Sequence, residues 1–157
     1  MKIGRRDMAT TTQEMRQTWM AVLARASRAE LEYRVAAVAA LPSYEMMTPA
    51  SIGTVMVEGR AGGTGARFNL GEATMTKAVV RLDDGTMGFA YALGRDTQKA
   101  VLCAVLDAVL QSESRHGELM HAVIEPLADA QRRRRLDASR KAAATKVEFF
   151  TLQRGDG

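Results

Sequence analysis

Residues 73–93 read ATMTKAVVRLDDGTMGFAYAL, and this stretch decides the fold class. Its two flanks, 73–82 and 86–93, are rich in β-branched, aromatic and other apolar residues, which is typical of strands. Between them stands Asp83-Asp84-Gly85, and Asp-Gly between two such runs is a strong hairpin signal because it tolerates positive φ. The stretch therefore predicts two antiparallel strands joined by a tight turn.

A third strand-like run precedes this hairpin. Thr54–Glu58 is again β-branched and apolar, and Pro49 and Gly53 are expected to bound it. Residues 52–93 are thus predicted to form an antiparallel meander of at least three strands.

Two helix starts lie upstream of the meander. Thr11 with Glu14, and Ser27 with Glu30, have the spacing of capping boxes. Apolar residues at helical spacing follow each start: Met15, Trp19, Val22, Leu23 and Ala26, then Leu31, Val35 and Val38. Leu41-Pro42 is expected to end the second helix, because a residue before proline is disfavoured in the helical region. We predict a helical hairpin here, preceded by a disordered basic leader over residues 1–10.

The region after the meander is expected to be mostly helical. Asp96 is a candidate N-cap for a helix whose part 100–110 is apolar almost all round, apart from Asp107, and therefore buried. We expect a polar break at 112–117, a short apolar segment at 119–127 that ends around Pro126, and a helix with a thin apolar stripe at 128–146. A strand-like run, 147–152, follows. The prediction is one α+β domain over residues 11–157.

Composition narrows the class of protein. The 157 residues are 46% hydrophobic and 25% charged, which is ordinary for a globular chain. No apolar run is long enough for a membrane span, and the start has no apolar signal segment, so we expect a cytoplasmic protein. The single cysteine, Cys103, cannot form an intrachain disulfide or hold an iron–sulfur cluster or a zinc ion alone. We expect no cofactor bound by this chain.

Gly62-Gly63-Thr64-Gly65, followed by Arg67, is the most suggestive loop. Successive backbone N–H groups in a glycine-rich turn can cradle an anion, and an arginine adds bidentate contacts to phosphate. The loop lacks the GK[ST] of a P-loop. Three interpretations stay open: a tight connection between strands, a partner contact and a ligand contact.

Other polar residues fit simpler interpretations. His116 and His121 are five residues apart, a poor spacing for a helical metal pair, and Cys103 lies among apolar neighbours where thiols are usually inert. Arg132–Arg135 spread over all faces of a helix, so a solvated helix with local ion pairs, an acidic-partner contact and nucleic-acid binding are all compatible with them. No aromatic residues interleave with these arginines to support base stacking.

Several motifs follow one another along the chain: RQTWMAVLA at 16–24, AGGTGARF at 61–68, LGEATMTK at 70–77, VRLDDGTMG at 80–88, LGRD at 93–96 and EFFTLQRGD at 148–156. In this order they resemble the PhnG family of phosphonate carbon–phosphorus lyase subunits. The resemblance covers roughly residues 14–156.

The resemblance implies a subunit of a cytoplasmic core complex with PhnI, PhnH and PhnJ, two copies of each. The resemblance also implies that the chain, together with PhnI, PhnH and PhnL, supports a reaction in which an alkylphosphonate displaces adenine from ATP. With methylphosphonate as the substrate, the product is ribose 1-methylphosphonate 5-triphosphate. ATP and methylphosphonate would be substrates of the complex.

We expect no catalytic or metal-binding residue in this chain. Arg67, Arg95 and Arg154 are the residues considered as sources of positive charge for such a reaction. The residues expected to contact a partner or an anion are Gly62, Gly63, Thr64, Gly65, Arg67, Arg95, Asp96 and Arg154.

Three functions stay open at this point. The chain is a structural and interaction subunit, a contributor of ligand-binding residues to a shared active site, or a small basic nucleic-acid-binding protein. The formal charge of +4 is too small to choose among nucleic acid, anionic metabolites and an acidic partner.

Overall fold

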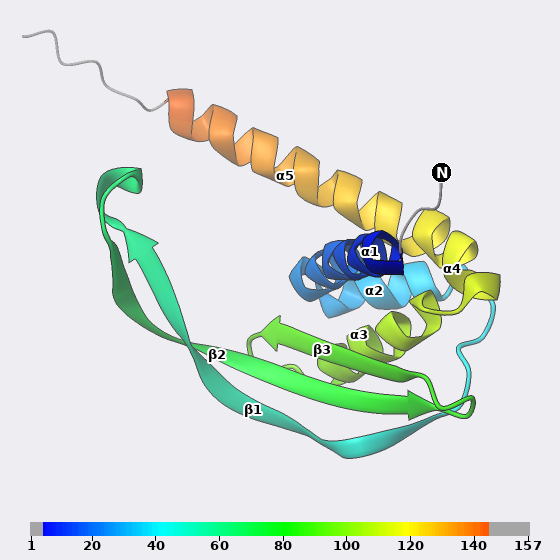
Figure 1. Cartoon of the computed structure of the whole chain (residues 1–157). Helices are drawn as coiled ribbons and strands as arrows, with labels where there is room; N and C mark the ends of the chain where they lie inside the picture. The colour runs from blue at the N-terminus through cyan, green and yellow to red at the C-terminus, as the bar shows by residue number, and fades with distance from the viewer. Residues whose placement is uncertain (1–4, 145–157) are drawn as a thin grey trace, which may run out of the picture.

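A computed structural model describes residues 5–144 as an α+β fold with a three-stranded antiparallel sheet and helices packed against it (Figure 1). The elements run in the order α1 Arg5–Arg25, α2 Arg28–Val35, β1 Tyr44–Arg60, the 3-10 turn η1 Ala61–Gly63, β2 Arg67–Leu82, β3 Met87–Leu93, α3 Thr97–Leu110, α4 Glu113–Leu119, the π-helical turn η2 Met120–Ile124 and α5 Glu125–Ala144.

The predicted meander is confirmed, with strand order β1-β2-β3 and both pairings antiparallel. The backbone N–H of Leu82 donates to Thr86 O at 2.9 Å, and this hydrogen bond closes the hairpin between β2 and β3. Gly85 has φ +87°, the left-handed conformation expected of an Asp-Gly turn, and Asp84 Oδ1 accepts from Thr86 N–H at 2.8 Å.

The strands are longer than predicted, and this changes the shape of the molecule. β1 begins at Tyr44 and runs through Pro49, which was expected to precede the strand. Proline is tolerated there because β1 is an edge strand, and the register shifts nearby, between Met46 and Thr48 and between Thr48 and Ser51.

β3 pairs only with the part of β2 from Met75 to Arg81. Beyond that point β1 and β2 continue as a two-stranded ribbon, residues 54–74, which we call the arm. In Figure 1 the arm curves away from the helices and its tip rises toward the C-terminal end of α5.

The core lies between one face of the sheet and the helices. The side chains of Ala78, Val80 and Ala90 are buried on the face that α3 covers. Gly88 allows the closest approach, because a Cβ atom there would lie 1.9 Å from the carbonyl oxygen of Ala104. Burial of a leucine such as Leu106 contributes roughly 1.5–3 kcal/mol, so α3 is a major source of stability.

The helical hairpin is confirmed, but its ends differ from those predicted. The capping box of Ser27 and Glu30 is present at the start of α2. α1 begins at Arg5, within the segment expected to be a leader, so Thr11 lies inside the helix and does not cap it. α2 ends at Val35, six residues before Leu41, because the chain turns there to reach β1.

The buried helix is confirmed as α3, and Asp96 caps it by accepting from Lys99 N–H at 2.9 Å. The polar break predicted at 112–117 is wrong, since residues 113–119 form α4. Pro126 ends no element: it lies in the first turn of α5, where a proline needs no helical N–H partner. The strand predicted at 147–152 lies outside the described residues. Within residues 5–144, no helix combines the length and the apolar character that a membrane span requires.

Candidate functional site

The glycine-rich loop forms the tip of the arm. Gly62 has φ +58° and ψ +17°, a conformation that glycine adopts without strain. A Cβ atom at Gly65 would lie 2.6 Å from the carbonyl oxygen of Ala61, so this glycine is required by close packing.

The backbone N–H groups of Thr64 and Gly65 both donate to Ala61 O, the second at 2.8 Å. Two of the donors that an anion would need therefore already serve the turn. The geometry favours the interpretation of this loop as a tight connection.

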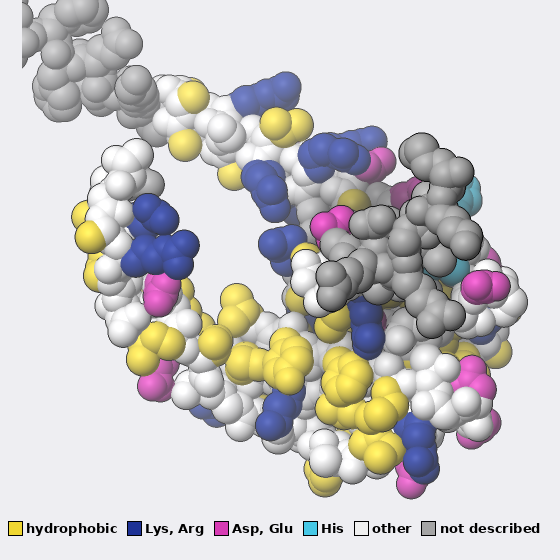
Figure 2. All heavy atoms as spheres, viewed as in Figure 1, with side chains coloured by type: hydrophobic (Ala, Val, Ile, Leu, Met, Phe, Trp, Pro, Cys, Tyr) yellow, Lys and Arg dark blue, Asp and Glu magenta, His cyan; other side chains and the backbone are white. Residues whose placement is uncertain are grey.

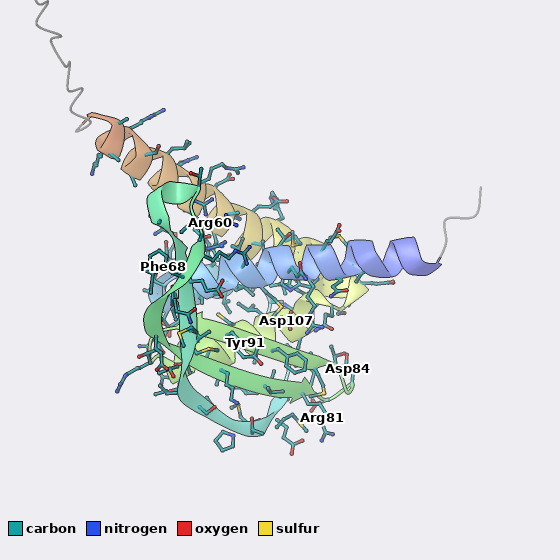
Figure 3. All side chains as sticks on the ribbon, turned by 60° about the vertical axis from the view of Figure 1, so that its left-hand side comes forward. Arg60, Phe68, Arg81, Asp84, Tyr91 and Asp107 are labelled. Atoms are coloured by element: carbon teal, nitrogen blue, oxygen red, sulfur yellow. The ribbon has the colours of Figure 1, made fainter. Side chains whose placement is uncertain are left out.

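Two arginines flank the tip on opposite strands. Arg60 and Arg67 are direct register partners, the last pair before the loop. The guanidinium of Arg67 has an exposed partner in Glu58, with Nη1 and Oε2 3.8 Å apart. Residues in the same register position point to the same face of a two-stranded ribbon, so two positive charges share one face of the tip. Figure 3 shows Arg60 in this position.

The other face of the arm is apolar. Phe68, the next residue along β2, points away from the arginine face because side chains alternate along a strand. Its side chain is 47% exposed, and that of Leu70, which packs over Gly59, is 63% exposed. Val55 and Val57 continue the row on β1 and are also exposed. We call Val55, Val57, Phe68 and Leu70 the apolar face of the arm.

An open cleft of about 820 Å³ lies at the base of the arm. It is lined by Val55 and Met75, by Tyr91 and Leu93 of β3, and by small residues of α1, with Arg25 and Lys99 also at its wall. Figure 2 shows hydrophobic side chains gathered on this face of the sheet and an open hollow between the arm and the helices. Lys and Arg side chains border the hollow on both sides.

Arg95 and Asp96, which were also predicted as site residues, lie far from the tip of the arm. Arg95 is exposed in the connection from β3 to α3, and Asp96 next to it caps α3 and lies 3.9 Å from Arg28 Nη1. β3 ends opposite Met75, eight residues along β2 from Arg67, which is roughly 25 Å of strand. The structure therefore separates Arg95 and Asp96 from the loop. Arg154 lies outside the described residues.

The structure builds one polar cluster that sequence reasoning missed. The carboxylate of Asp107 on α3 is completely buried and accepts four hydrogen bonds. The donors are Arg16 Nε at 3.1 Å, Arg16 Nη2 at 2.6 Å, Trp19 Nε1 at 2.9 Å and the backbone N–H of Phe89 at 2.9 Å. Figure 3 shows Asp107 in the interior, near the sheet. The cluster joins α1, β3 and α3 and fixes how the arm's base is oriented relative to the helices.

A signal for this cluster was present in the sequence. An aspartate inside an otherwise apolar helix needs a partner, because an unpaired buried charge is very costly. The partners are 88 and 91 residues away, so the sequence alone does not identify them.

A second cleft, of about 850 Å³, lies beside this cluster, between α1, the end of α3 and α4. His116 lines it, and its Nδ1 lies 2.8 Å from Leu110 O while its ring meets Trp19 edge-on at 5.5 Å. This histidine is therefore held by the core. His121 is exposed and pairs with Glu125.

Cys103 is buried, and burial raises the pKa of its thiol to about 11. A thiol with such a pKa is neutral near pH 7, and we therefore expect it to be unreactive in the folded chain. No group of three metal-ligating side chains occurs in the described part of the chain.

The arginine run lies on the exposed α5. Arg132 pairs with Asp129 on its own helix, and Arg134 pairs with Glu30 of α2 at 2.7 Å. The run therefore has local and tertiary ion pairs, in line with a solvated helix.

Comparisons with known proteins give the family context. The family model described as "Phosphonate metabolism protein PhnG" matches residues 14–155. A curated protein of Rhizobium meliloti (strain 1021), alpha-D-ribose 1-methylphosphonate 5-triphosphate synthase subunit PhnG, is 39% identical over 143 residues, covering 90% of this chain and 90% of that protein.

Proposed function

Since this chain belongs to the PhnG family, we propose that it is a subunit of a complex that acts in phosphonate breakdown. The relative from Rhizobium meliloti is named as a subunit of a synthase whose product is alpha-D-ribose 1-methylphosphonate 5-triphosphate. By that likeness, the complex joins an alkylphosphonate to the ribose of ATP and releases adenine. ATP and methylphosphonate are then substrates of the complex, and this chain holds no cofactor of its own.

The observation that carries this proposal is the arm. A two-stranded ribbon is marginally stable in water, and this one exposes apolar side chains along its length. Contiguous exposed apolar surface on a folded protein marks an interaction site. The described residues thus support a protein that works by contact with other subunits.

We assign the chain an interaction role and no catalytic step. The side chains that line the cleft at the base of the arm include no serine, cysteine or histidine that could act as a nucleophile–base pair. The partners that the family resemblance implies are PhnI, PhnH and PhnJ in a core with two copies of each, and PhnL as an accessory subunit. The cytoplasm is the compartment in which such a complex would meet ATP.

Reconstitution tests this proposal. PhnI, PhnH and PhnL from the same source are purified with and without this chain, and adenine release from ATP plus methylphosphonate is measured. We expect release only when the chain is present, and no release from the chain alone. Equal release without the chain would refute the proposal.

A further inference from the structure

We propose that the arm docks on an acidic surface of another subunit of this complex, with Arg60 and Arg67 binding carboxylates of that subunit while its apolar walls cover the apolar face of the arm. This inference rests on the proposed function, because it needs a partner subunit. It adds to that function the surface, the residues and the chemistry of the partner.

The first step is that no third strand among residues 5–144 pairs with the arm. β1 and β2 pair with each other over residues 54–74, and β3 has already ended opposite Met75. Within the described part of the chain, both outer edges of the ribbon therefore carry backbone groups without a neighbouring strand. The side chains of Leu70 and Met56 are 63% and 53% exposed. A ribbon in this state gains stability when another protein covers it.

The second step is the charge at the tip. Like charges directly opposite each other destabilise a β-ribbon, and Arg60 is directly opposite Arg67. Within residues 5–144, Arg67 forms an ion pair with Glu58, and the side chains of these two residues are 70% and 56% exposed. Water screens such a pair strongly. Two guanidinium groups on one face offer matched, planar donors for carboxylates, and binding of carboxylates would relieve their repulsion.

The third step selects an acidic protein surface over other occupants. A second copy of this chain carries the same +4 charge and the same arginine pair, so two tips repel each other. A nucleic acid needs a track of positive charge along its backbone, whereas the positive charge of residues 54–74 is confined to the one pair of arginines at the tip. The apolar face on the opposite side of the tip would also stay uncovered on a phosphate backbone.

The test uses the complete complex. The chain is co-expressed with PhnI, PhnH and PhnJ, one partner carries the affinity tag, and the amount of this chain recovered with it is measured. The variants are Arg60→Glu alone and Arg60→Glu combined with Arg67→Glu. The matched control is Lys77→Glu, which makes the same charge change at an exposed position ten residues further along β2.

We expect the double variant to be recovered with the tagged partner at least tenfold less than wild type, and Lys77→Glu to stay within twofold. For Arg60→Glu alone, the thermal midpoint of the isolated chain is measured as well. If these arginines had only a structural role, this variant would lower the thermal midpoint together with assembly. It converts the like-charged pair into an opposite-charged pair, so the thermal midpoint of the isolated chain should stay equal or rise while assembly falls.

Three outcomes would overturn the inference. One is recovery of the double variant at the wild-type level. Another is an equal loss for the double variant and for Lys77→Glu, which would indicate a general charge effect. The third is normal assembly with weakened binding of ATP to the assembled complex, which would assign the arginines to the substrate's phosphates. If wild-type chain is not recovered with any tagged partner, the proposed function itself fails.

Discussion

Replacing Asp107 with asparagine should destabilise the chain strongly, although the two side chains have nearly the same shape. Oδ1 accepts from Arg16 Nε and Trp19 Nε1, and Oδ2 accepts from Arg16 Nη2 and Phe89 N–H. Whichever way an asparagine amide is oriented, its NH₂ group faces two donors. One bond from Arg16 and one from a neutral donor are therefore lost together.

The magnitude follows from these two losses. A hydrogen bond to a charged group contributes about 1.5–3 kcal/mol, and a buried donor left without an acceptor costs about 1–3 kcal/mol. The side chain of Arg16 is 29% exposed and can turn partly toward water, so we take the lower half of the sum, about 3–4 kcal/mol. In a chain of this size, such a loss lowers the thermal midpoint by roughly 6–16 °C.

Chemical denaturation followed by the fluorescence of Trp19, the single tryptophan, measures this loss directly. The control is Asp129→Asn, because Asp129 is exposed and pairs with Arg132 on the same helix, so its effect should stay within about 0.5 kcal/mol. A free energy of unfolding for Asp107→Asn within about 1 kcal/mol of wild type would refute the reasoning that the cluster joins α1, β3 and α3.

Three further predictions concern single positions. Gly88→Ala should destabilise by about 3 kcal/mol or more, since its Cβ atom would meet Ala104 O at 1.9 Å and α3 would have to move off the sheet; a urea midpoint equal to wild type would contradict this. Cys103 should resist a thiol reagent at pH 8 in the native chain and react at once in denaturant, because burial raises its pKa to about 11. The thiol ionises at a lower pH in the unfolded chain, so the free energy of unfolding should fall as pH rises from about 9 through 11. Rapid labelling of the folded protein would argue against burial. Gly62→Ala should cost only about 1 kcal/mol of stability, because its φ is +58° but nothing lies within 4 Å of the added Cβ atom; unfolding of the whole chain on this change would show that the tip is part of the core.

Local chemistry explains which elements could be predicted from the sequence. The Asp84-Gly85 turn and the Ser27–Glu30 capping box each depend on residues within a few positions of one another, and both are present. The buried helix could be predicted because Ala100–Leu110 is apolar on all sides apart from Asp107. The sequence by itself therefore determined the α+β class, the meander and the order of most elements.

Longer-range effects explain the misplaced boundaries. Pro49 indicated a strand boundary, but an edge strand tolerates proline, and only the pairing with β2 made β1 an edge. The polar stretch 112–117 indicated a break, yet residues 113–119 form α4, which is anchored by its last residue, Leu119, in the core.

The residues of the candidate site likewise divide into those that the sequence indicates and those that only the fold identifies. The sequence singled out the glycine loop and Arg67, because their composition is unusual within a short segment. It did not single out Arg60, whose importance comes from its register with Arg67, or Asp107, whose donors lie on two other elements. Only the tertiary structure decided that β3 stops opposite Met75 and leaves the ribbon two-stranded within residues 5–144. The physical reason is that strand pairing depends on contacts between segments far apart in the chain, whereas propensities, turns and caps depend on sequence neighbours.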